Sequence, residues 1–92
     1  MSIRKNYNVK NVRIGNLLTE KRKNICCGSR EKFIDERSRT IFNDEAWISL
    51  RHLANLEEGK TLPSIEMLIN LAYAFEENPE DLFIEIYDIL RS

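Results

Sequence analysis

The segment 49–57 carries the side chains with the most specific chemistry in this chain. Arg51 and Asn55 are four residues apart, so a helix would place them on one face, one turn apart. A guanidinium can donate two hydrogen bonds to O6 and N7 of guanine, and a side-chain amide can pair in a similar way with adenine. Leu53 and Leu56 would be buried on the other side. The pattern is typical of a helix that reads base edges, although any amphipathic surface helix also turns polar residues outward.

Groups that could catalyse a reaction are few. The one histidine, His52, has no evident nucleophile or orienting group to work with, and the chain has no phosphate-binding loop. Cys26 and Cys27 are adjacent, and neighbouring cysteines bond to each other only through a strained ring. Together with His52 they supply too few ligands for zinc. We therefore expect no enzymatic activity, no metal, no cofactor and two reduced, partly buried thiols, with thiol sensing as the alternative role of the pair.

Charge is distributed unevenly along the 92 residues, although the formal net charge is only −1. Residues 1–23 carry seven Lys or Arg and one Glu, whereas residues 61–92 carry seven acidic residues and one Arg. The first part, including a basic arm at 1–10, suits a polyanion, and the last part repels one. The length allows one domain, 1–92, with a core so modest that a second copy would help its stability.

No apolar run approaches the roughly 20 residues of a membrane span, and no signal-peptide pattern opens the chain. We therefore expect a cytoplasmic protein without a membrane partner.

Apolar residues recur at helical spacing almost throughout, and no segment alternates long enough to predict a strand. Five helices are expected. Three of them lie at about 9–23, 46–56 and 79–90, and the other two begin after the capping residues Ser29 and Ser64. Gly59 would end the helix at about 46–56, and Asn78 with Pro79 would begin the last. The expected fold class is all-α, with five helices.

The last predicted helix is apolar over more of its surface than one packing face requires. Glu85 and Asp88 mark one polar strip on it, and apolar residues cover most of the rest. We therefore predict one face for the domain core and a second for a homodimer. The residues assigned to the dimer interface are Phe83, Ile84, Ile86, Tyr87 and Leu90. The alternative is a core enlarged enough to cover both faces.

From Leu53 onward the chain reads LANLEEGKTLPSIEMLINLAYAFEENPEDLF. This resembles the second half of the Cro and phage-repressor (XRE) family of helix-turn-helix proteins, which runs I-x-x-I-E-x-G-x-x-x-P-S, then an apolar helix, then a capped L-F. The first half is similar but looser. It is matched by Ile14, Gly15, Leu18, Arg22, Ser29, Arg30, Phe33 and Ile34, with Arg in place of the family's Gln and Ile in place of its small Ala. The resemblance covers about residues 12–84, and the size is similar to that of restriction–modification controller proteins.

About ten residues between Asp35 and Ile48 are extra relative to the family pattern. Ser29 to Gly59 spans thirty residues, where the family motif has roughly twenty. The insertion includes Ile41, Phe42 and Trp47, which favour a packed segment. In that case the second helix runs on by one or two turns, Asn43 caps a new start, and the next helix begins near Asp44. The alternative is a flexible wing, ordered only on DNA, with Arg37 and Arg39 on phosphates.

The resemblance implies a repressor-like, transcription-regulating homodimer that binds an inverted-repeat operator in double-stranded DNA. It places Leu50, Arg51 and Asn55 at base-facing positions, Ser49 at a phosphate-contacting cap, and Arg30 and Lys60 at backbone-contact positions. His52 is counted with this DNA-binding set, although a plain surface histidine is the simpler interpretation. Arg22 and Glu57 match a structural ion pair between the first helix and the recognition helix. The alternative function is an antitoxin-like module that binds a partner protein through the acidic C-terminal helix.

Overall fold

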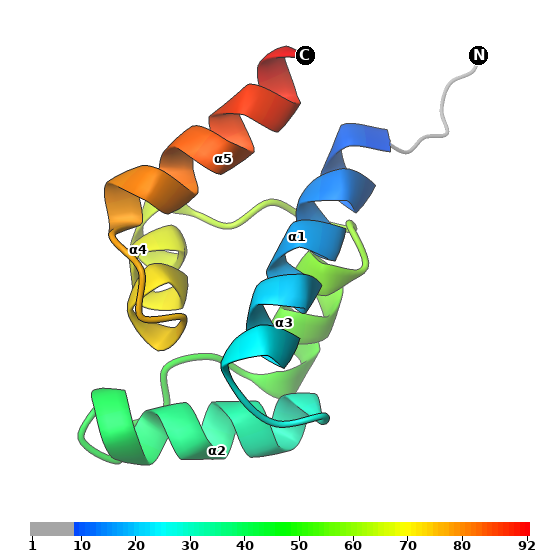
Figure 1. Cartoon of the computed structure of the whole chain (residues 1–92). Helices are drawn as coiled ribbons and strands as arrows, with labels where there is room; N and C mark the ends of the chain where they lie inside the picture. The colour runs from blue at the N-terminus through cyan, green and yellow to red at the C-terminus, as the bar shows by residue number, and fades with distance from the viewer. Residues whose placement is uncertain (1–8) are drawn as a thin grey trace.

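The computed structural model describes residues 9–92, and these residues form five helices and no strand (Figure 1). The helices are α1 (Val9–Ile25), α2 (Arg30–Ile41), α3 (Leu50–Glu57), α4 (Ile65–Ala74) and α5 (Pro79–Arg91). The expected all-α class is confirmed. Most of the arm predicted at 1–10 lies outside the described residues. Within them, no helix is long and apolar enough to cross a membrane.

Short polar side chains fix where four of the helices begin. Ser29 Oγ accepts a hydrogen bond from the backbone N of Lys32 at 3.1 Å, and Asn78 Oδ1 accepts one from Glu80 N at 2.8 Å. Ser49 and Ser64 cap α3 and α4 in the same way. Each cap satisfies an amide that the first helical turn leaves without a partner.

The inserted segment is packed, but it is not helical as far as predicted. α2 does continue to Ile41, and residues 42–49 then form a turn and an extended stretch. Asn43 and Asp44 have φ values of 56° and 66°. Because left-handed residues end a right-handed helix, the prediction that the next helix begins near Asp44 is wrong, and α3 begins at Leu50.

Trp47 anchors the inserted segment. Its side chain is buried, and its Nε1 donates to the Ile34 carbonyl at 3.2 Å. The indole stacks on Phe42 with ring centroids 4.8 Å apart and meets Phe33 edge-on at 5.9 Å. Arg37 is also buried, so it is not the exposed phosphate contact that the flexible-wing alternative requires.

The core lies where α1, α3, α4 and α5 meet above α2 (Figure 1). All five helices contribute to it. The largest fully buried side chains are Ile14 and Leu18 from α1, Phe33 from α2, Leu53 and Leu56 from α3, Leu71 from α4, and Leu82 from α5.

Two predictions about individual side chains are wrong. Ile86 was assigned to the dimer interface, but it is 5% exposed and belongs to the core, because it lies one turn beyond the buried Leu82. Cys26 and Cys27 were expected as separate thiols, but their sulfur atoms are bonded to each other. The turn that follows α1, in which Cys27 has φ of 56°, brings the two sulfurs together.

Candidate nucleic-acid interface

A buried ion network holds the C-terminal end of α3. Arg22 Nε donates to Glu57 Oε2 at 2.6 Å, and Arg22 Nη2 donates to Oε1 at 3.1 Å. Arg30 Nε donates to the same Oε1 at 2.7 Å. The Glu57 side chain is 0% exposed, and that of Arg22 is 5% exposed. The predicted pair between Arg22 and Glu57 is therefore present, and Arg30 makes it a cluster of three.

The charges of this network determine the ionisation of Glu57. Burial by itself would raise the pKa of the Glu57 carboxyl. The hydrogen bonds and positive charges of Arg22 and Arg30 outweigh burial, so the pKa lies below its ordinary value. Glu57 is therefore ionised at neutral pH, and its charge is balanced inside the domain.

Two glycines allow α1 and the end of α3 to approach closely. A Cβ on Gly15 would lie 2.3 Å from the Glu57 carbonyl oxygen, and a Cβ on Gly59 would lie 2.8 Å from Val12 Cα. Gly59 also has φ of 79°, which lets it end α3 as predicted from the sequence. These contacts and the ion network fix α3 against α1, side by side as Figure 1 shows.

The opposite, N-terminal end of α3 faces outward. Ser49, Leu50 and Arg51 are exposed, and Asn55 is half-buried one turn beyond Arg51. Leu50 is 44% exposed, so it is available for an apolar contact and is not part of the core. Within the described residues, no carboxylate pairs with Arg51. This surface, made of Ser49, Leu50, Arg51 and Asn55, is called the α3 face below.

Three other residues of the predicted DNA-binding set are placed differently. Arg30 is 32% exposed at its side chain and already bonds Glu57, while its Nη1 lies 3.9 Å from a Glu58 carboxylate oxygen. Lys60 is exposed, with its Nζ 3.1 Å from the other Glu58 oxygen. His52 is half-buried, and its Nε2 atom is buried with no hydrogen-bond partner in the described part of the chain. Arg30 and Lys60 thus already have carboxylate partners, and His52 has its Nε2 atom buried, so none of the three matches the exposed Arg51.

Two cations that position the helices were missed by sequence reasoning. Arg37 donates to the Ala74 carbonyl at 3.2 Å and to Glu76 Oε2 at 2.9 Å, which ties α2 to the end of α4. Lys21 bridges Glu77 and Glu85, which ties α1 to α5. Partial burial lowers the pKa of Lys21, but its bonds to the two glutamates outweigh this and raise it. The sequence does indicate that Arg37 is buried, because it lies four residues from both Phe33 and Ile41 and so shares the apolar stripe of α2 with them.

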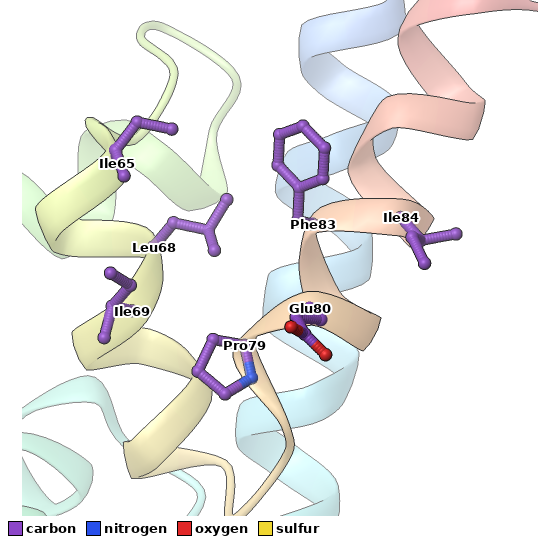
Figure 2. A pocket seen from close by; sticks show the side chains of 7 residues that line it. All are labelled: Ile65, Leu68, Ile69, Pro79, Glu80, Phe83 and Ile84. Atoms are coloured by element: carbon purple, nitrogen blue, oxygen red, sulfur yellow. The ribbon is translucent and has the colours of Figure 1, made fainter.

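Of the residues assigned to the dimer interface, four are exposed on α5. The exposed fractions are 46% for Phe83, 53% for Ile84, 51% for Tyr87 and 38% for Leu90. Beside them, an open groove of about 480 Å³ runs between α4 and α5 (Figure 2). None of the residues that line this groove belongs to the α3 face, because all of them lie on α4 and α5.

Among residues 9–92, no group of three or more His, Cys, Asp or Glu side chains is arranged to hold a metal ion. Comparisons of the chain with protein-family models, with curated proteins and with solved structures gave no match in any of the three. The candidate interface is therefore defined by its own geometry: a short helix fixed at one end and exposed at the other.

Proposed function

We propose that this protein binds double-stranded DNA in a sequence-specific way, with α3 in the major groove, and that it regulates transcription as a repressor-like factor. The observation that carries the proposal is the α3 face, at the capped end of a helix held by the ion network. It exposes Leu50 and the guanidinium of Arg51, which pairs with no carboxylate among residues 9–92. A protein of this kind acts in the cytoplasm by binding, without catalysis.

The side-chain types on the α3 face suit base recognition. Arg51 would donate to guanine O6 and N7, Asn55 would pair with adenine, and Leu50 would contact a thymine methyl group. Ser49, with its amide-rich helix start, would lie near a phosphate. The resemblance of residues 12–84 to the XRE family supports the same assignment.

Lys60 and Arg30 have a different place in this proposal. Both would contact phosphates, which hold a protein in register without reading sequence. Each is within 4.0 Å of Glu58 or Glu57 in the free protein, so DNA would compete with these carboxylates. We therefore expect Arg51 to determine specificity and Lys60 to contribute mainly affinity.

Selection of bound sequences from random duplex DNA tests the proposal. The purified protein should enrich a short motif with two inverted half-sites about 34 Å apart, because a two-fold dimer spaces its recognition helices by about one helical turn. Arg51→Ala should lose the preference at one position in each half-site. Arg13→Ala is the control and should enrich the wild-type motif, because Arg13 is an exposed arginine on α1 that donates to Ser92 and is not part of the α3 face. Absence of any enriched motif would contradict the proposal.

A second candidate function is an antitoxin-like module that binds another protein, and the apolar groove between α4 and α5 favours it. Retention on heparin separates the two. A DNA-binding protein elutes late, and its affinity falls steeply as salt rises, because each phosphate contact releases counterions. A module that binds only protein should pass through the column at low salt.

A further inference from the structure

The turn between α1 and α2 contains a disulfide bond between adjacent residues, Cys26 and Cys27. Disulfides stabilise proteins in large part by closing a loop in the unfolded chain, and the gain grows with the length of that loop. A bond between neighbours closes almost no loop, so it adds little to global stability. What it does restrict is the backbone of residues 26–29, called the disulfide turn below.

The disulfide turn is bonded directly to the side chain that holds α3. Arg22 Nη1 donates to the carbonyl oxygen of Cys27 at 3.5 Å and to that of Gly28 at 3.4 Å. The Nε and Nη2 atoms of the same guanidinium hold the Glu57 carboxylate. Because a guanidinium is planar and its donors point in fixed directions, a shift of the two carbonyls changes how Arg22 meets Glu57.

The closed ring also holds Cys27 in a conformation that the open form would leave. Cys27 has φ of 56°, in the left-handed region that is unfavourable for a residue with a Cβ. A ring through both sulfurs and the intervening peptide restricts this angle. Opening the ring frees Cys27 to return to negative φ, which rotates its carbonyl away from Arg22. The disulfide and the clamp on α3 are therefore linked through one side chain.

Cys27 can be reached from solvent, because it lines an open cleft of about 350 Å³. The lining consists of Cys27, Lys32, Asp35, Glu36 and Arg39. Glu36 is already bonded to Arg37, so two cations face one remaining carboxylate in this cleft. Positive charge beside a cysteine stabilises the thiolate and so favours exchange with another thiol. The cleft therefore suits a small thiol that carries negative charge.

We propose that the Cys26–Cys27 disulfide is a redox-sensitive switch, opened by an anionic low-molecular-weight thiol in the cleft at Cys27, and that its opening loosens the hold of Arg22 on α3. The thiolate attacks Cys27 Sγ, the S–S bond breaks, and Cys26 Sγ leaves with the electron pair and takes up a proton. A second thiol attacks the mixed disulfide, so that Cys27 also leaves as a thiol. Two molecules of the reductant are thus oxidised to one disulfide, and the reverse exchange closes the switch.

Glutathione, whose carboxylates make it an anion, tests the opening step on the full chain without DNA. Alkylation with iodoacetamide followed by mass spectrometry counts the free thiols. Both cysteines should become reactive as reduced glutathione is added and become protected again when oxidised glutathione is in excess. A disulfide that stays closed in millimolar reduced glutathione, or a pair that stays open in the oxidised form, would overturn the switch.

A neutral thiol tests the assignment of the cleft. At equal thiolate concentration, glutathione should open the disulfide faster than the uncharged 2-mercaptoethanol. Arg39→Gln should remove this advantage, because Arg39 lines the cleft. Arg13→Gln is the matched control, since Arg13 is an exposed arginine on α1 outside the cleft, and it should keep the advantage. Equal rates for the two thiols on the wild type would overturn the choice of an anionic thiol.

Hydrogen exchange resolved by residue with NMR tests the link to α3. The amides of Glu58 and Gly59, which bond back to the last turn of α3, should exchange at least about fivefold faster in the open form. The amides of Leu68 and Leu82, at the starts of α4 and α5, are internal controls and should not change. Unchanged rates at Glu58 and Gly59 would overturn the link. An equal rise at all four amides would overturn it too, because it would show only a general loss of stability.

Two variants separate the ring from the arginine. The double variant Cys26→Ser and Cys27→Ser has no ring to close, so its Glu58 amide should exchange as in the open wild type, with or without glutathione. Arg22→Lys keeps the charge but has a single nitrogen in place of the guanidinium, so it does not bond the turn and Glu57 as Arg22 does. In this variant, closing the ring should no longer slow exchange at Glu58. If closing still slowed it as much as in the wild type, the link through Arg22 would be overturned.

Discussion

Arg22 and Glu57 lie 35 residues apart in sequence and meet through two hydrogen bonds at the crossing of α1 and α3. Arg30 adds a third bond from the start of α2. One carboxylate therefore joins three helices, and α3 owes the orientation of its exposed face to this cluster.

Removal of the Glu57 charge should be costly. Glu57→Gln leaves the Arg22 guanidinium, 5% exposed at its side chain, without its counterion, which should lower the free energy of unfolding by about 3–5 kcal/mol. Urea denaturation followed by circular dichroism measures this. Glu58→Gln is the control, because the Glu58 side chain is 45% exposed and its ion pairs should be worth under about 1 kcal/mol. Equal stabilities of the two variants would show that the cluster does not hold the helices together.

The lowered pKa of Glu57 also predicts how stability depends on pH. Folding lowers this pKa below its ordinary value of 4.5, so the unfolded chain takes up the proton first as pH falls. The contribution of the ionised Glu57 to the free energy of unfolding is therefore complete above its ordinary pKa. It disappears as pH falls through the lowered pKa of the folded state. We expect the stability difference between wild type and Glu57→Gln to shrink on acidification below about pH 5. Urea titrations from pH 7 to pH 3 test this, and a difference that grows with acid would contradict it.

Much of the fold was predictable because its signals are local. Ser29, Ser64 and Asn78 cap helices where the sequence indicates, and the apolar spacing marks most of the core. The start of α3 after Ser49 agrees with the segment 49–57 indicated by the sequence. The earlier start near Asp44 was wrong because Asn43 suits a helix cap and a left-handed turn equally well, and only the packing of Trp47 decides between them.

The candidate site was predictable in part. Spacing alone could not divide the apolar residues of α5 between two faces, so Ile86 was assigned to the wrong one. Arg30 was predicted as a contact to the DNA backbone because the resemblance places it at such a position, at the N-terminus of the second helix. Arg30 and Glu57 are 27 residues apart, and their bond depends on how α2 and α3 cross, which no local pattern contains.

The inserted segment should be ordered in the free protein. The Trp47 side chain is buried against Phe42 and Phe33, so Trp47→Ala should cost about 3–5 kcal/mol of stability. In the wild type, the amides of Glu45 and Asp44, which donate to the carbonyls of Phe42 and Ser38, should exchange slowly with solvent. Hydrogen exchange followed by mass spectrometry measures the segment, with the exposed Thr61 and Leu62 as the comparison. Exchange equally fast in both segments would support the flexible wing.

The central claim is that Arg51 reads a base, and it is tested most directly by the affinities of two variants for a set of DNA duplexes. Each duplex carries the selected site with one base pair changed, and binding is measured at fixed salt. Arg51→Ala should lose about 1–3 kcal/mol on the selected site and become indifferent to one base pair per half-site. Lys60→Ala should weaken every duplex about equally and reduce the salt slope by about one unit. Equal losses for Arg51→Ala on the selected and the scrambled duplexes would contradict the account, because they would make Arg51 a phosphate contact.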